Sequence, residues 1–169
     1  MSGRPALRGG GEVMLRAARQ QDRDDILRMQ DAAFPGDALA MSREGFAGVL
    51  HERGTQLIVA ETGGQIAGYC LLRHRKWRPW AGVDFLCVEA AFSGRGLGGM
   101  LLRGACDRTA RPLIRLFVRP DNERARALYT RLGFRQTGLR KANYHDGTDA
   151  IVLMKWLGLF RRGANRDIP

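Results

Sequence analysis

The amino-acid sequence predicts a single-domain α/β protein. Segments with the apolar alternation of β-strands take turns with segments whose apolar residues recur at helical spacing. A glycine-rich turn at residues 94–99 joins a buried strand to a helix near the middle of the chain. The 169 residues suffice for one hydrophobic core, and neither an internal repeat nor a second domain is visible. We expect a flexible segment at residues 1–12, the domain at residues 13–158 and a C-terminal tail at residues 159–169.

The first half of the chain predicts three strands and two helices. Residues 13–17 form the first expected strand, and residues 22–33 form an amphipathic helix. The sequence Phe-Pro-Gly-Asp ends that helix, and Ser42 is expected to cap a second helix that runs to about residue 51. A hairpin follows, with strands at residues 57–61 and 65–73 around a Gly-Gly turn.

The second half predicts four strands and two helices. Residues 83–88 form a buried strand, and the glycine-rich turn leads to a helix that opens at Met100 and ends before Arg111. An apolar strand at residues 113–118 precedes a helix that Asp121 or Asn122 caps and Gly133 ends. The last two strands are expected at residues 134–140 and 150–157.

The glycine-rich turn predicts an anion-binding site. Backbone N–H groups at a helix start lack intrahelical partners, and the helix dipole favours a negative charge there. Glycine has no Cβ, so a diphosphate can approach the backbone closely. Residues 94–99 also match the G-x-G-x-x-G dinucleotide fingerprint, although five residues separate them from the strand. A turn that binds no ligand is a third interpretation.

Two elements of the chain resemble the GNAT superfamily of acyl-CoA-dependent N-acyltransferases. The turn is similar to its diphosphate-binding signature, (Q/R)-x-x-G-x-(G/A), with Gly96 and Gly98 at the two small positions. Ser93 departs from the first position of that signature, and Arg95 supplies a positive charge two residues later. Residues 121–134, DNERARALYTRLGF, match the superfamily's N-x-x-A-x-x-L-Y-x-x-x-G-F element at every named position. On these two elements the chain is identified as a member of the superfamily.

The resemblance implies a fold and a cosubstrate. The fold is a mixed, mostly antiparallel seven-stranded sheet with about four helices, and its central strands splay apart to admit acyl-CoA. The cosubstrate is acetyl-CoA, with no metal. An N–H of Val88 can point at the thioester oxygen, and each preorganised donor of this kind contributes roughly 3 kcal/mol to the transition state. The residues implied to contact acetyl-CoA are Leu86, Cys87, Val88, Ser93, Gly94, Arg95, Gly96, Leu97, Gly98, Gly99, Asn122 and Tyr129.

Within the superfamily the chain looks most like the ribosomal-protein-alanine N-acetyltransferase group. The similar segments are Ala-Phe-Pro at residues 33–35, Leu-Cys-Val at residues 86–88 and RKANYHDGTDA at residues 140–150. This likeness implies acetyl transfer to the N-terminal α-amine of a protein or peptide, with Phe34, Phe46 and Tyr144 on the acceptor side. A small-molecule amine acetyltransferase shares every motif and stays open. A non-catalytic acyl-CoA-binding or nucleic-acid-binding module is the alternative from another class.

Tyr129 and Asp84 are the candidate catalytic residues. A phenol with a pKa of about 10 is protonated at neutral pH and can donate a proton to a departing thiolate. Periodicity alone makes Tyr129 a core residue, and the full motif makes it the acid. The ribosomal-protein-alanine group carries a glutamate where this chain has Phe117, so Asp84 is the nearest replacement base. An unbroken strand would place Asp84 on one face with Leu86 and Val88, and a salt-bridged surface aspartate is equally compatible with the sequence.

Composition limits the remaining function classes. The net charge of +11 comes mostly from scattered arginines, which form a solvated basic surface that attracts a polyanionic acyl-CoA. No helix-turn-helix, zinc-finger or RNA-platform signature accompanies this charge, so we do not expect nucleic acid as the main partner. The three cysteines lack metal spacing and are predicted to be reduced core thiols of a cytoplasmic protein. No apolar run could span a membrane and no signal peptide is visible, while the oligomeric state leaves no pattern.

Overall fold

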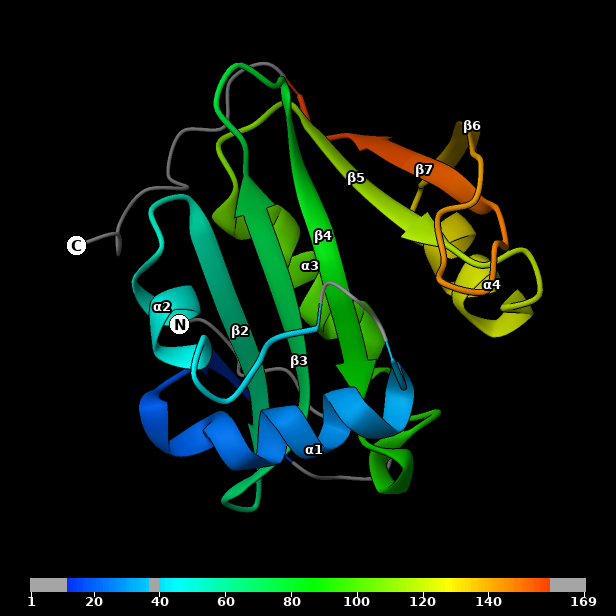
Figure 1. The fold of residues 1–169 in the computed structure, drawn as a ribbon. Coiled ribbons are helices and arrows are strands. Elements are labelled where there is room, and N and C mark those ends of the chain that lie inside the picture. Colours follow the sequence, from blue (N-terminus) through cyan, green and yellow to red (C-terminus); the bar gives the residue numbers. More distant parts are fainter. Residues whose placement is uncertain (1–11, 37–39, 159–169) are drawn as a thin grey trace.

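The computed structural model describes residues 12–36 and 40–158, and it contains one seven-stranded sheet (Figure 1). The strand order is β1-β2-β3-β4-β5-β7-β6, and the pair β4–β5 is parallel while the other neighbours are antiparallel. The predicted mixed, mostly antiparallel sheet is therefore confirmed. The strands are β1 (Met14–Ala17), β2 (Thr55–Thr62), β3 (Gln65–His74), β4 (Trp80–Val88), β5 (Leu113–Val118), β6 (Arg135–Arg140) and β7 (Ala150–Trp156).

The described residues form four α-helices, as predicted. They are α1 (Arg23–Ala33), α2 (Phe46–His51), α3 (Leu97–Arg108) and α4 (Glu123–Arg131). Helices α1 and α2 lie over the sheet face that is turned toward the viewer in Figure 1, which we call the front face, and α3 lies behind the sheet. None of the helices in the described part of the chain is long and apolar enough to cross a membrane.

Each face of the sheet carries its own hydrophobic core. The rear core packs Leu101 and Leu102 of α3 against β2, β3 and β4, and it includes Tyr129 of α4. The front core packs Ile26 of α1 and Phe46 of α2 against β2, β3 and β4. The cysteines at positions 70, 87 and 106 are free thiols buried in these cores, as the sequence predicted.

Strands β4 and β5 pair over only part of their length. The parallel register runs from Trp80 opposite Leu113 to Val83 opposite Leu116. Strand β4 continues to Val88, and beyond Val83 the two strands diverge (Figure 1). The predicted splay of the central strands is confirmed. From residue 84 onward, the β5-facing edge of β4 has no strand partner among the described residues.

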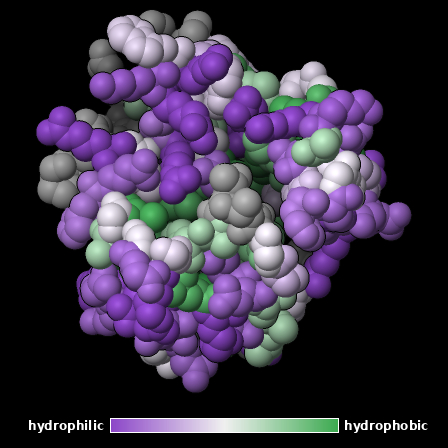
Figure 2. Space-filling view, in the orientation of Figure 1, coloured by the Kyte–Doolittle hydropathy of each residue, from purple (hydrophilic) through white to green (hydrophobic). Residues whose placement is uncertain are grey.

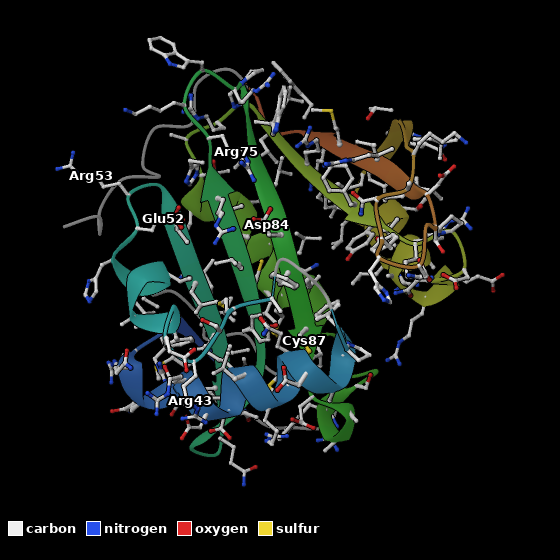
Figure 3. All side chains as sticks on the ribbon, viewed as in Figure 1. Arg43, Glu52, Arg53, Arg75, Asp84 and Cys87 are labelled. Carbon is white, nitrogen blue, oxygen red and sulfur yellow. The ribbon has the colours of Figure 1, made fainter. Side chains whose placement is uncertain are left out.

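A β-bulge at Asp84 overturns the expected grouping of side chains on β4. Leu71 of β3 pairs with Phe85 and Leu72 pairs with Val83, so Asp84 is an extra residue in β4. The bulge resets the alternation along the strand. Leu86 and Val88 pack on the rear core, whereas Phe85 and Cys87 belong to the front core. Asp84 lies on the front face and not with Leu86 and Val88 (Figure 3).

Two predicted helix starts were wrong. Helix α3 begins at Leu97 instead of Met100, so Gly98 and Gly99 belong to its first turn. Helix α2 begins at Phe46, because the Ser42 hydroxyl accepts a hydrogen bond from the Gly45 N–H (2.9 Å) and closes a turn before the helix. Apart from residue 12, the predicted flexible segment at residues 1–12 and the tail at residues 159–169 lie outside the described residues.

Candidate active site

The glycine-rich turn forms the start of α3 in the way that an anion site requires. Gly94 and Gly96 adopt positive φ angles of 80° and 90°, which residues with a Cβ rarely take. Gly96 is the N-cap of α3, and its carbonyl already accepts the Met100 N–H (3.1 Å). The N–H groups of the first helical turn therefore have no intrahelical acceptor and point out of the helix end.

Positive side chains flank this helix start. Arg95 is exposed, and its guanidinium stacks on the Phe92 ring at 5.6 Å. Arg124 of α4 reaches within 4.0 Å of the position that a Cβ on Gly94 would occupy. A Cβ on Gly96 would meet nothing within 4 Å, so space is open beside the N–H groups. The residues present therefore fit the diphosphate of an acyl-CoA.

The unpaired edge of β4 leads from this helix start toward the middle of the sheet. The side chains of Leu86 and Val88 pack on the rear core, so β4 offers its backbone to a ligand between the strands. An extended arm can add to such an edge as a further strand. Burial raises the pKa of the Cys87 thiol to about 11, and its sulfur donates to the Met29 carbonyl (3.6 Å). Cys87 is thus a core thiol whose side chain faces away from such an arm.

Tyr129 lies in the rear core with only 8% of its surface exposed. Its ring packs against Phe134, with the ring centroids 5.9 Å apart. Burial raises the pKa of the Tyr129 hydroxyl well above its usual range, and the neighbouring Cys70 and Tyr144 add to that increase. The hydroxyl therefore keeps its proton at any physiological pH.

Asn122 is the N-cap of α4, and it is one of the two residues that the sequence predicted for this position. Its side-chain carbonyl accepts the Ala125 N–H at 3.0 Å, and its side chain is exposed. This cap satisfies one of the N–H groups that a helix start leaves unpaired. It also fixes the start of the helix that carries Tyr129.

Asp84 lies on the front face, on β4 above α1 (Figure 3). Its carboxylate accepts a hydrogen bond from Arg73 Nη1 at 3.1 Å, and Arg73 also approaches Glu52 (3.4 Å). Burial raises the pKa of Asp84, and the positive charges of Arg73 and Arg75 oppose that increase. The sequence left a catalytic and a salt-bridged aspartate open, and the structure shows a salt-bridged carboxylate with a raised pKa.

The predicted acceptor-side residues occupy different environments. Phe34 caps the end of α1, and its ring meets Phe85 edge-on at 5.2 Å, next to Asp84 in the strand. Tyr144, in the β6–β7 connection, lies under the Arg119 guanidinium at 4.7 Å. Phe46 is completely buried in the front core. The first two remain candidate acceptor contacts.

The surroundings of His74 and His145 do not indicate a catalytic role. The His74 ring lies between the Gly54 carbonyl (3.1 Å) and the Thr109 hydroxyl (2.8 Å), and burial lowers its pKa. It therefore ties the start of β2 to the end of α3. His145 is exposed in the β6–β7 connection. In residues 12–36 and 40–158, no group of three His, Cys, Asp or Glu residues is arranged to hold a metal ion.

The front face also carries a group of arginines that sequence reasoning missed. Phe117 lies between the guanidiniums of Arg115 (4.9 Å) and Arg140 (5.4 Å). Arg115 is a charged residue in the middle of an otherwise apolar strand, and this irregularity is the signal that could have revealed it.

A surface hollow of about 310 Å³ elsewhere contains none of the predicted site residues. It lies between α3 and the end of β7.

Comparison with known proteins settles the family. Residues 23–134 match the profile of the acetyltransferase (GNAT) family, which is more than half of the chain. The chain belongs to this family. It is therefore an acetyltransferase of the GNAT type, and both halves of the motif-based identification are confirmed.

Relatives and solved structures of this acetyltransferase agree with the assignment. The N-alpha-acetyltransferase RimI of Mycobacterium tuberculosis is 31% identical over 150 residues, which cover 85% of this chain and 92% of the relative. The ribosomal-protein-S18-alanine N-acetyltransferase of Escherichia coli has the same fold (TM-score 0.73, 21% identity, 89% of this chain and 97% of that chain). So does Arabidopsis thaliana Naa50, solved with the bisubstrate analogue CoA-Ac-MVNAL (TM-score 0.70, 22% identity, 85% and 97%).

Proposed function

We propose that this enzyme transfers the acetyl group of acetyl-CoA to the N-terminal α-amine of a protein or peptide. The observation that carries the proposal is the nature of the available base. Strand β5 presents Phe117, and the carboxylate on β4, Asp84, is ion-paired to Arg73. Burial raises the pKa of Asp84, but a carboxylate is still a weak base beside a lysine ammonium with a pKa of about 10.4. An α-amine with a pKa of about 8 is already partly neutral near pH 7.5. The names of the mycobacterial and Arabidopsis relatives support the same acceptor class.

Different residues act on the donor, acetyl-CoA, and on the acceptor amine. Acetyl-CoA supplies the reactive thioester when it is bound. The N–H groups of Leu97, Gly98 and Gly99 would hold its diphosphate, and the unpaired edge of β4 would hold its pantetheine arm. Asp84 accepts the proton of the acceptor amine, directly or through a water. Tyr129 holds a proton at its hydroxyl oxygen for the departing sulfur.

Donor binding is testable by thermal denaturation. Acetyl-CoA at about 100 times its dissociation constant should stabilise the protein by roughly 2.7 kcal/mol, and NAD should not. At this chain length that gain corresponds to a Tm increase of roughly 5–10 °C. Stabilisation by NAD in place of acetyl-CoA would restore the dinucleotide interpretation of the glycine-rich turn.

Two variants of Gly98 separate charge from crowding in that experiment. A Cβ at this position would lie 3.2 Å from Leu128 Cδ2, so Gly98→Ala and Gly98→Asp both crowd α4. Only Gly98→Asp adds a negative charge where the diphosphate would bind. We expect the acetyl-CoA-dependent Tm increase to disappear in Gly98→Asp and to persist, reduced, in Gly98→Ala. Equal losses in the two variants would contradict a diphosphate at this helix start.

The pH dependence of activity follows from the surroundings of Tyr129. For an α-amine peptide, kcat/KM should rise with pH up to the amine pKa of about 8 and then stay level to about pH 10. The alkaline limb is absent from this range because burial raises the pKa of Tyr129, so the acid stays protonated. Circular dichroism at each pH controls for unfolding. A decline between about pH 9 and 10 in the folded enzyme would mean an acid with an ordinary phenol pKa.

A further inference from the structure

Three arginines and two aromatic rings alternate across the front face, and we call them the arginine ladder. Arg78 lies over Trp80 at 5.1 Å, and Arg115 contacts the same ring at 4.7 Å. Arg115 also lies over Phe117 at 4.9 Å, and Arg140 meets Phe117 at 5.4 Å. These stacks orient the guanidiniums without using their N–H donors, which remain available for an anion.

The arginine ladder lies on the same face as Asp84. On β5, Ile114, Leu116 and Val118 pack into the rear core, so Arg115 and Phe117 between them face the front. Figure 2 shows this face with hydrophilic residues over much of its upper half and hydrophobic residues visible between them near the middle. The arginine ladder therefore borders the surface from which an acceptor reaches Asp84.

No salt bridge within the described residues neutralises the positive charge of the arginine ladder. None of Arg78, Arg115 and Arg140 forms an ion pair with a carboxylate there, and the Nε of Arg115 is buried without a hydrogen-bond partner. Burial, followed by repulsion from Arg140, Arg75 and Arg78, lowers the pKa of Arg115, and the negative charge of Asp84 opposes that decrease. A cluster of like charges that the fold leaves unpaired costs stability, and a bound anion would offset that cost.

Nearby carboxylates are already engaged by other arginines. Arg73 holds Asp84 at 3.1 Å, and Arg119 holds Asp146 in the β6–β7 connection. The protein thus separates arginines that neutralise its own acids from those of the arginine ladder, which have no acid of their own among the described residues. An external acid is the missing partner.

The donor does not supply that acid. Trp80 opens β4, whereas the glycine-rich turn follows the other end of the strand at Val88. Eight residue steps at about 3.3 Å each separate these ends by roughly 25 Å. The arginine ladder is therefore separate from the helix start that would hold a diphosphate.

We propose that the arginine ladder binds acidic side chains of the acceptor, so that preferred acceptors are protein N-termini with Asp or Glu shortly after the first residue. This inference rests on the proposed α-amine acetylation. Arg115 is the register partner of Gly82, which lies two residues before Asp84, so Arg115 lies about 8 Å from Asp84 between Cα atoms. An extended peptide spans about 3.3–3.6 Å per residue, so roughly residues 2 to 4 of the acceptor reach the arginine ladder.

Three peptides test the proposal. They share one N-terminal alanine and blocked lysines, and they differ in carrying aspartate, asparagine or arginine at positions 2 to 4. We expect kcat/KM, measured by CoA release, to be about tenfold higher for the aspartate peptide than for the asparagine peptide. The arginine peptide should be lower by about another tenfold. The differences should appear mainly in KM and should shrink between about 0.05 M and about 0.5 M salt.

Variants assign the preference to the arginine ladder. Arg115→Gln and Arg140→Gln should each bring the ratio of the aspartate to the asparagine peptide toward one. Arg140 is exposed, so its variant keeps the test valid if Arg115→Gln fails to fold. The matched control is Arg53→Gln, which removes an exposed arginine from the loop before β2, away from Asp84 (Figure 3). It should keep the full preference for the aspartate peptide.

The outcomes separate this inference from the function beneath it. Equal acetylation of all three peptides would overturn the inference and leave α-amine acetylation standing. Acetylation of free aspartate as fast as of the peptides would overturn both, because the acceptor would then be a small acidic amine. Binding of single-stranded RNA that is lost in Arg115→Gln, without any preference among the peptides, would overturn the inference in favour of a nucleic acid.

Discussion

Replacing Tyr129 with phenylalanine should lower kcat about 10²-fold or more while leaving the affinity for acetyl-CoA nearly unchanged. The variant keeps the ring that packs on Phe134 and loses only the hydroxyl, whose raised pKa keeps it protonated. The rate of acetyl-CoA turnover gives kcat, and the Tm increase on acetyl-CoA binding reports the affinity. Together they separate an effect on the chemical step from an effect on binding. The Tm of the unliganded variant should change little, because the ring that fills the core is retained.

Tyr69→Phe is the matched control for that experiment. Tyr69 is also buried, but it lies in the front core and takes no part in the proposed chemistry. Removing its hydroxyl should leave kcat unchanged. An unaltered kcat in Tyr129→Phe would make Tyr129 a core residue and would transfer the role of acid to another group.

The second large effect concerns the acceptor amine. Near pH 7.5 roughly a quarter of α-amines are neutral, against about one lysine in a thousand, so a site with a weak base should favour α-amines about 10²-fold. Deprotonating a lysine ammonium near pH 7.5 requires about 4 kcal/mol, which the site would have to supply. Two peptides measure this ratio, one with a free N-terminus and blocked lysines, the other with a blocked N-terminus and one free lysine. Comparable kcat/KM values for the two peptides would refute the preference.

Asp84→Asn tests the base within the same assay. We expect it to lower kcat/KM for the α-amine peptide near pH 7 about tenfold or more, and less near pH 9, where most of the amine is already neutral. Glu52→Gln removes the other carboxylate beside Arg73 and should leave the rate unchanged. A rate on lysine that is lost in Asp84→Asn would show that Asp84 is a stronger base than its ion pair implies.

The sequence predicted those parts of the fold that local signals determine. The apolar strand at Leu113–Val118 was placed at its observed bounds, because its apolar residues are bounded by prolines on both sides. Helix α4 was placed correctly because Asn122 caps its start and Gly133, with a φ of 86°, follows its end. The same glycine and tyrosine motifs located the family, which the profile match over residues 23–134 confirms.

The features that the sequence did not reveal depend on contacts between distant segments. Residues 83–88 contain no glycine or proline, so nothing in them marks the bulge, which appears only when β3 supplies its register. Phe46 was predicted on the acceptor side from a resemblance to the ribosomal-protein-alanine group, and its complete burial in the front core was not apparent from the sequence. The arginine ladder joins residues from three separate segments, Arg78, Arg115 and Arg140, and only strand pairing brings them together.

The extra residue in β4 has a consequence for how this strand could have changed during evolution. If Asp84 were deleted, Val83 and Phe85 would become consecutive while keeping Leu72 and Leu71 as their partners in β3. Phe85 and Cys87 would still enter the front core, and Leu86 and Val88 the rear core. The reason is that the side chains on either side of Asp84 already alternate between the two faces of the sheet. A one-residue insertion at this point can thus add a carboxylate to a complete sheet, and a one-residue deletion can remove it, without repacking either core.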